Sequence, residues 1–274
     1  MTDHRAPGPY DVIIVGAGHN GLVTAAYLAG AGRRVLVLER RPFVGGAATT
    51  EDFGGGLRAD AVWAGGRLRP DIARDLRLAL PPADGSPTFT SLLAPSPLML
   101  PADPARAAEC IRPFSEKDAR RWPEFVAFMN RSARFLDRAY ATLMPRLPRG
   151  YGARRGLDLA RLAVDLRLLG RRDMLNLIRL LPMTAAEFLE EWFESEPLKG
   201  ALGSLAVHGA TLGVMSPGTG FTLLHNWLNR GGLANANAGR LGGMTAALAA
   251  AAQSRGAVIR TEAEVAAIRV DNYT

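Results

Sequence analysis

A glycine-rich turn between a β-branched run and an alanine-rich run is the feature that most constrains this fold. Residues 11–16 read Asp-Val-Ile-Ile-Val-Gly, which is typical of a buried parallel strand. Residues 20–31 are rich in Ala and Leu and predict a helix that stops at Gly32. A second buried strand is predicted at 35–38. A strand–helix–strand unit of about 30 residues is the size of a βαβ unit.

The turn itself, Gly16-Ala-Gly18-His-Asn20-Gly21, has GxGxxG spacing in the context that a dinucleotide-binding motif requires. Gly16 permits the tight turn, Gly18 lets the backbone approach a pyrophosphate, and Gly21 lets the helix pack close to the strand. The pyrophosphate would meet free N–H groups and the positive end of the helix dipole. Asn20, inside the turn, is counted among the expected contacts. A glycine-rich turn of an unrelated α/β protein is the alternative.

An acidic residue follows at the position where a ribose is held. Glu39 ends the second strand, 18 residues after Gly21, and its carboxylate can accept hydrogen bonds from a ribose hydroxyl pair. A carboxylate there repels a 2′-phosphate and so disfavours NADP. Arg40, beside it, is a further candidate contact. These residues do not separate FAD from NAD.

The next residues carry a family resemblance. Arg41-Pro-Phe-Val-Gly45-Gly46-Ala47-Ala-Thr-Thr50 resembles the Gly-Gly segment of amine oxidases and phytoene desaturases. In that group the glycine pair brings a second backbone segment against the FAD phosphates. Many members have Arg after the pair, so Ala47 points toward the phytoene desaturase-like branch.

Two further segments resemble the same branch. Gly242-Gly243-Met244, within a segment that begins at Gly239, is similar to the turn that returns the chain to the FAD domain, and residues 53–70, with Asp60 and Gly65-Gly66, resemble the segment under the flavin ring. The resemblance implies that Val265 contacts the adenine through its backbone. It covers roughly the first 75 and last 40 residues. We identify the family as phytoene desaturase-like FAD-dependent oxidoreductases, on the branch that includes the pyridine nucleotide-disulfide oxidoreductase domain-containing proteins.

The expected fold is therefore α/β, a Rossmann-like FAD-binding domain with a parallel sheet, split by a mostly helical substrate domain. The FAD-binding domain is assigned to residues 1–75 and 232–274, and the inserted domain to 76–231. Helices are predicted at 115–144, 157–181 and 184–194. A strand predicted at 265–270 is followed by an Asp-Asn turn signal and no return strand, so we expect the C-terminal part of the fold to be missing.

By resemblance the function is an FAD-dependent oxidoreductase that takes a hydride from an apolar, isoprenoid or lipid-like substrate. The middle of the chain has no second GxGxxG turn, and Cys110 is the only cysteine, so the electron acceptor is expected to be external. No acid–base pair is apparent, and no catalytic residue is assigned. The alternative is a non-enzymatic protein that uses FAD structurally or as a redox sensor.

The composition argues against nucleic acid and metal ions as binding partners. The net charge of +7 rests on arginine, because Lys117 and Lys199 are the only lysines among 33 basic residues. There is no basic run interleaved with aromatics, so nucleic acid is not expected. The four histidines lack metal-ligand spacing, so no metal site is expected.

Trp122 and Trp192 are expected in the core. Residues 12–31 are read as strand–turn–helix rather than a targeting segment, which favours a cytoplasmic location.

The positive charge of the chain is concentrated in one segment. Residues 131–180 carry twelve Arg against four Asp. Within 157–172, leucines recur at helical spacing beside arginines, as in helices that lie on anionic membranes: Leu157, Leu162, Leu166 and Leu169. Peripheral membrane contact is one interpretation. A helical lid with a solvated arginine face is the other, and on sequence alone we favour it.

Overall fold

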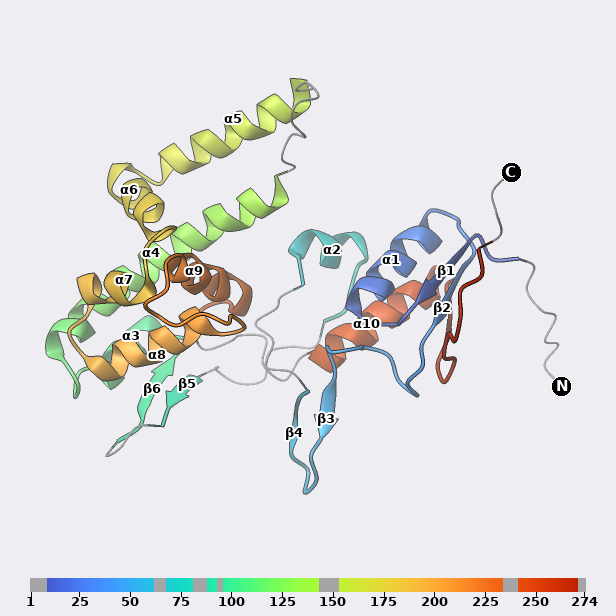
Figure 1. The fold of residues 1–274 in the computed structure, drawn as a ribbon, viewed down its shortest axis with the longest axis horizontal. Helices are drawn as coiled ribbons and strands as arrows, with labels where there is room; N and C mark the ends of the chain where they lie inside the picture. The colour runs from blue at the N-terminus through green and yellow to red at the C-terminus, as the bar shows by residue number, and fades with distance from the viewer. Residues whose placement is uncertain are drawn as a thin grey trace. The chain divides into compact units, whose positions relative to one another are not determined.

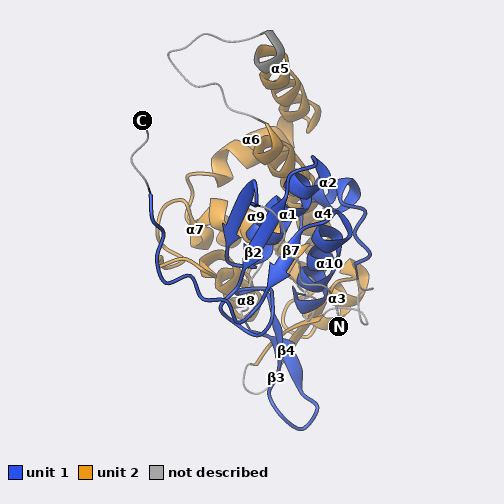
Figure 2. Ribbon diagram, turned by 90° about the vertical axis from the view of Figure 1, so that its right-hand side faces the viewer, with its two compact units in different colours: residues 1–83, 237–274 blue, residues 84–236 orange. Residues whose placement is uncertain are grey.

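The computed structural model describes residues 9–61, 68–80, 88–92, 96–142, 153–233 and 241–270. It divides into two compact units, which Figure 2 colours separately. The first unit is Met1–Ala83 with Asn237–Thr274, and the second is Asp84–Ala236. The chain thus leaves the first unit and returns to it.

A parallel sheet with two helices on one face forms the first unit (Figure 1). The strands lie in the order β1-β2-β7, all parallel: β1 (Val12–Val15), β2 (Val35–Leu38) and β7 (Val258–Arg260). The register places Ile14, Val37 and Ile259 on one face, where they pack with the helices α1 (His19–Gly30) and α10 (Leu241–Ser254). The Rossmann-like fold predicted from the βαβ pattern is confirmed.

The predicted end of the first helix is also confirmed. Gly32 has φ +79° and donates its N–H to the Ala29 carbonyl at 2.9 Å. The next residue, Arg33, donates to the Leu28 carbonyl at 3.0 Å. A left-handed glycine of this kind satisfies the last carbonyls of a helix and turns the chain toward the next strand.

Between β2 and the second unit lie a hairpin, β3 (Thr50–Asp52) with β4 (Arg58–Asp60), and the short helix α2 (Pro70–Asp75). The strand predicted at 265–270 is wrong, because residues 261–270 form no strand. The amides just before it, Glu262 and Ala263, donate to the carbonyls of Arg41 and Glu39 instead. An apolar alternation predicts a strand only where a neighbouring strand can pair with it.

Helices dominate the second unit. Its described elements are β5 (Thr88–Ser91), β6 (Leu98–Pro101), α3 (Pro104–Ile111), α4 (Glu116–Ala141), α5 (Ala153–Leu168), α6 (Arg171–Leu180), α7 (Ala185–Trp192), α8 (Glu196–Val207) and α9 (Thr219–Arg230). The predicted helices at 115–144 and 184–194 are confirmed. The one at 157–181 is two helices, because Gly170 at φ +83° breaks it.

Helix α9 lies in a Gly- and Asn-rich part of the sequence that was not among the predicted helices. Left-handed glycines stand at both of its ends, Gly218 at φ +82° and Gly231 at φ +72°. Leu223, Leu224 and Trp227 bury its apolar face in the core of the unit. Tertiary burial therefore outweighs the low local helix propensity here.

An aromatic cluster fills this core. The Phe125 ring, fully buried, lies 5.0–6.2 Å, centroid to centroid, from five other rings: Trp122, Phe188, Trp192, Phe193 and Trp227. Several of the pairs are edge-to-face, the arrangement that aromatic quadrupoles prefer. The core placement predicted for Trp122 and Trp192 is confirmed.

A buried carboxylate joins α4 to the start of α8. Ser115 caps α4 by accepting the Asp118 N–H at 3.1 Å. The Asp118 side chain itself turns to other residues. Its Oδ2 accepts the Ser195 N–H at 2.8 Å, and both its oxygens accept the Glu194 N–H. Asp118 is fully buried and satisfies amides that precede α8.

We expect Asp118→Ala to destabilise the second unit by about 2–4 kcal/mol, because it leaves two backbone N–H groups without their acceptor. The measurement is urea unfolding followed by tryptophan fluorescence, since Trp122, Trp192 and Trp227 all lie in this unit. The control is Glu116→Ala two residues away, whose ion pairs are half exposed and worth under about 1 kcal/mol. Equal unfolding midpoints for the two variants would contradict the role of Asp118.

Candidate functional site

The glycine-rich turn opens directly into an uncapped helix. Gly16 has φ +96° and donates its N–H to the Leu38 carbonyl at 2.7 Å. Gly18 is the N-cap of α1, and no side chain accepts a hydrogen bond there. The first turn of α1 also has no acidic residue, and His19 and Asn20 are exposed. These amides and the helix dipole form an environment that favours an anion.

The glycines differ in what surrounds them. A Cβ on Gly21 would overlap the Gly16 carbonyl oxygen and lie 3.4 Å from the Ile14 Cγ2 atom, so this glycine lets the helix meet the strand as predicted. A Cβ on Gly18 would have only one heavy atom within reach, the Gly46 Cα at 4.0 Å. Gly18 has φ −71°, which any residue can adopt. The chain itself therefore gives no reason for glycine at position 18.

Gly45 and Gly46 bring a second backbone segment against this turn. Gly45 donates its N–H to the Ala17 carbonyl at 2.8 Å and forms a parallel bridge with Gly18. A Cβ on Gly46 would lie 3.1 Å from the Gly18 Cα, and the φ values of Gly45 and Gly46 are +124° and +61°. Both the close approach and the backbone conformation require glycine. The structure thus brings Gly16, Gly18, Gly45 and Gly46 together.

Glu39 lies beneath the turn and bonds to both segments. Its side chain is only 6% exposed. Oε2 accepts the Ala17 N–H at 2.8 Å, and Oε1 accepts the Arg41 N–H at 2.9 Å. Burial alone would raise the pKa of Glu39, but the Arg41 and Ala17 amides and the nearby arginine charges together hold this pKa below its ordinary value. A carboxylate has about four lone-pair sites, so it retains capacity for further donors.

Arg41 is a residue that the sequence did not single out. Its Nη1 donates to the Gly46 carbonyl at 2.9 Å, and its guanidinium lies 5.0 Å from the centre of the Phe43 ring. Arg40, which the sequence did select, is exposed. Two adjacent arginines follow Glu39, and only the tertiary structure shows which of them turns toward the glycine pair.

Three further polar residues attach α10 to the hairpin. Asp60 Oδ1 accepts the Thr50 hydroxyl at 2.8 Å and the Leu241 N–H at 3.3 Å. Thr50 Oγ1 accepts the Gly242 N–H at 3.0 Å, and the Thr245 hydroxyl donates to the Ala48 carbonyl at 3.1 Å. Side-chain oxygens thus occupy the N-terminal amides of α10. Only the Asp60 position could have been found in the sequence, as an acid within the segment likened to the flavin-ring segment.

Gly242, the second residue of α10, lies too close to β3 to carry a side chain. A Cβ on Gly242 would lie 2.9 Å from the Thr50 amide nitrogen. The preceding Gly239, and Gly65-Gly66 of the other quoted segment, lie outside the described residues. Val265 is half-buried, two residues after Ala263, whose N–H donates to the Glu39 carbonyl at 2.9 Å. That bond ties the segment leading to Val265 to the end of β2.

His225, in the second unit, contacts a polar side chain with each of its ring nitrogens. The His225 ring nitrogens lie 2.8 Å from the Tyr140 hydroxyl and 2.9 Å from the Asn229 amide nitrogen. Burial lowers the pKa of His225. Within the described ranges, no group of three His, Cys, Asp or Glu side chains is arranged to hold a metal ion.

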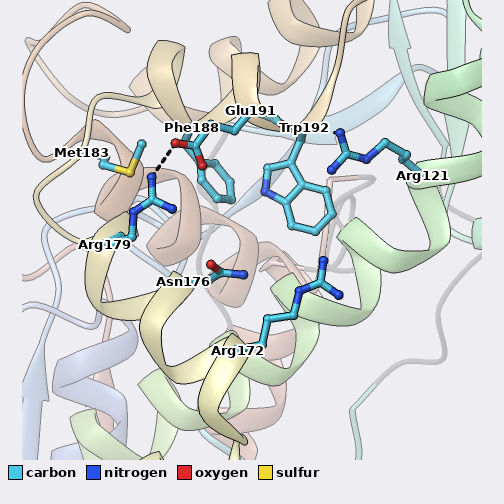
Figure 3. Close-up of a pocket in the computed structure, with 8 residues that line it drawn as sticks. All are labelled: Arg121, Arg172, Asn176, Arg179, Met183, Phe188, Glu191 and Trp192. Carbon is cyan, nitrogen blue, oxygen red and sulfur yellow. Dashed lines mark hydrogen bonds and ion pairs between the residues drawn. The ribbon is translucent and has the colours of Figure 1, made fainter.

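A hollow of about 190 Å³ in the second unit is polar (Figure 3). Arg179 pairs with Glu191, and Arg172 pairs with Glu124 at 2.8 Å. Arg121 donates to the Glu191 carbonyl at 3.1 Å and lies over the Trp192 ring. Ion-paired arginines line this space, so it does not provide the apolar cavity expected for the substrate.

Comparison with known proteins agrees with this geometry. The model of the NAD(P)-binding Rossmann-like domain matches residues 14–65, which contain the turn, Glu39 and the glycine pair. Pyridine nucleotide-disulfide oxidoreductase domain-containing protein 2 of Rattus norvegicus is 35% identical over 301 residues, which cover 96% of this chain and 49% of that protein. The chain is a homologue of these proteins.

Two further proteins are similar to part of this chain or to nearly all of it. One of the subunits of limonene dehydrogenase from Castellaniella defragrans is 41% identical over 127 residues, which cover 42% of this chain and 22% of that protein. A crystal structure of an oxidoreductase from Methanosarcina mazei has a TM-score of 0.50 at 17% identity and covers 95% of this chain and 53% of its own, which shows a shared fold. The chain spans about half the length of the curated relatives it matches along its whole length.

Gly21→Ala is expected to destabilise the first unit by about 1–3 kcal/mol, because the new Cβ overlaps the Gly16 carbonyl oxygen. Gly18→Ala, three residues away, is the control and should leave stability near wild type. The measurement is thermal unfolding followed by circular dichroism. If both variants melt together, the helix does not meet the strand as closely as described.

Glu39 should also make the stability of the first unit depend on pH. Its pKa is lowered from 4.5 in the folded state, so it stabilises the fold above pH 4.5 and this contribution is lost as pH falls through the folded value. Glu39→Gln should therefore destabilise the protein near neutral pH, and the difference from wild type should shrink toward pH 3. Thermal unfolding of both proteins across this range tests it. A difference that stays constant with pH would contradict the role of the charge.

Proposed function

We propose that this turn binds FAD and that the protein is an FAD-dependent oxidoreductase. The observation that carries the proposal is the space at Gly18. A Cβ there would meet no protein atom closer than 4.0 Å, yet the uncapped amides of α1 and the glycine pair flank the same position. Residues that leave such a space beside free N–H donors fit a pyrophosphate.

In this proposal each expected contact has a part. The amides at the start of α1, with Gly18 and Asn20, would hold the pyrophosphate from one side, and Gly45-Gly46 would hold it from the other. The Glu39 carboxylate, which keeps free lone pairs, would accept the ribose hydroxyls and exclude a 2′-phosphate. Val265 would meet the adenine through its backbone, and Arg40 remains a candidate contact.

The substrate that we propose is small and apolar, of the isoprenoid or lipid-like class. Limonene, which appears in the name of one relative, is an apolar hydrocarbon. FAD when bound supplies a two-electron acceptor, so the protein needs only to position the substrate and keep water away. This fits the absence of an evident acid–base pair in the sequence. An external electron acceptor completes the proposal, since the sequence has no second dinucleotide turn.

A non-enzymatic FAD-binding protein is the alternative from another class. Anaerobic bleaching separates the two. The yellow protein is mixed with limonene, or with a longer apolar polyene, and its flavin absorbance is followed without oxygen. Bleaching supports the oxidoreductase, whereas flavin that dithionite bleaches but no apolar substrate does supports the alternative.

Gly18→Ala should weaken FAD binding by roughly tenfold or more, because its methyl group occupies the space proposed for the pyrophosphate. The stability of the flavin-free protein should not change. The control is Gly200→Ala in α8, where an added Cβ also meets open space. FAD affinity is measured by quenching of flavin fluorescence. Wild-type affinity in Gly18→Ala would show that the phosphate is bound elsewhere.

A further inference from the structure

Helix α5 has large apolar side chains on the face that points away from the core. Its inner face carries Leu166, which packs against the core cluster together with Leu169, the residue that follows the helix. Its outer face carries Leu157, Val164 and Leu168, which are 51%, 56% and 76% exposed. These three are spaced seven and four residues apart, and so form one row along the helix. The leucines grouped by the sequence prediction therefore belong to two faces.

Helix α6 continues the pattern. Leu177 and Leu180 are buried, whereas Leu175 and Ile178 are 46% and 49% exposed. The exposed pair again lies on one side of its helix. We call the five exposed residues the outer row: Leu157, Val164, Leu168, Leu175 and Ile178. Figure 1 shows α5 and α6 as consecutive helices at one end of the second unit.

Two arginines that keep a free positive charge accompany the outer row. By helical spacing, Arg167 and Arg171 stand beside its middle, where α5 gives way to α6. Neither Arg167 nor Arg171 forms an ion pair with another residue in the described part of the chain.

The acids of α5 and α6 do not cancel this charge, because each is already paired. Asp158 pairs with Arg161 at 3.4 Å, Asp165 with Arg138 at 2.6 Å, and Asp173 with Arg131 at 2.6 Å. On the other flank of α6, Arg172 and Arg179 face the polar hollow of Figure 3. Arg172 and Arg179 are themselves paired with Glu124 and Glu191. Among the described residues, the free positive charge beside the apolar row therefore comes from Arg167 and Arg171.

A solvated lid explains the arginines but not the outer row. Exposed apolar patches on soluble proteins mark interaction sites, and these two consecutive helices expose five large apolar side chains. Leu, Ile and Val beside two arginines that are unpaired within the described ranges have the chemistry of a helix lying in the headgroup region of an anionic bilayer. None of the described helices is long and apolar enough to cross a membrane.

We propose that the outer row of α5 and α6 docks the protein on an anionic lipid surface. The five apolar side chains enter the boundary of headgroups and acyl chains, and Arg167 and Arg171 bind lipid phosphates. Charge complementarity decides the partner, because an apolar groove on another protein would not need Arg167 and Arg171, the two arginines left unpaired in the described part of this surface. This docking goes beyond the proposed function and does not depend on it.

Vesicle co-sedimentation tests the proposal with the purified protein. We expect binding to phosphatidylcholine vesicles that contain phosphatidylglycerol, little binding to pure phosphatidylcholine, and release by salt. Arg167→Gln with Arg171→Gln should lower the partition coefficient about twenty- to thirtyfold. The matched control for charge is Arg33→Gln with Arg106→Gln, exposed arginines outside this surface.

The apolar part is tested separately. Leu168→Ser with Ile178→Ser should lower the partition coefficient by roughly tenfold or more. The control is Leu92→Ser with Met215→Ser, which removes side chains that are 88% and 72% exposed elsewhere in the second unit. Circular dichroism confirms that each variant is folded.

Three results would overturn the proposal. They are equal binding to neutral vesicles, equal loss in test and control pairs, and wild-type binding by both test pairs. Glycerol phosphate as a soluble competitor distinguishes a membrane surface from a site for free phosphate. If it displaces the protein at millimolar concentration, the arginines bind a small anion rather than a bilayer. FAD content is recorded in parallel, so that failure of flavin binding and failure of docking appear as different results.

Discussion

The first unit depends on one buried carboxylate. Glu39 stands at the end of β2, and its two oxygens hold amides that lie 22 residues before it and two residues after it. The glycine-rich turn and the segment leading to the glycine pair therefore share one anchor. A buried charge is costly unless it is hydrogen-bonded, and here two backbone donors offset that cost. The residue expected to hold a ribose thus also supports the loop that would hold the phosphates.

This double role changes how the glycines are understood. Gly21 and Gly46 are required by the protein itself, because a Cβ on either would press on neighbouring backbone. Gly18 is not, since its backbone angles are ordinary and its surroundings are open. The fold therefore does not require glycine at position 18, whereas a ligand bound beside it would. This position supports the proposed pyrophosphate site more directly than the motif as a whole does.

The second unit is held together by aromatic packing and by polar contacts between distant residues. Its core is a set of aromatic rings around Phe125, and its loops are held by side chains such as Asp118 that satisfy distant amides. Directional polar contacts in a low-dielectric interior specify one arrangement among many apolar packings. The same unit leaves leucine, valine and isoleucine exposed on α5 and α6.

The sequence by itself determined the local parts of this protein. Strand, turn and helix around Gly16–Gly21, the acid at Glu39, the glycine pair and the helix start at Ser115 all follow from short-range rules, because each depends on neighbours within a few residues. The tertiary structure decided what depends on residues far apart. It turned Arg41 toward the glycine pair and used the Asp118 side chain to accept the amides of Glu194 and Ser195. It formed α9 from a glycine-rich sequence and left residues 265–270 without a strand. It also divided the leucines of α5 between two faces, because periodicity reveals that a helix is amphipathic but only packing decides which face is buried.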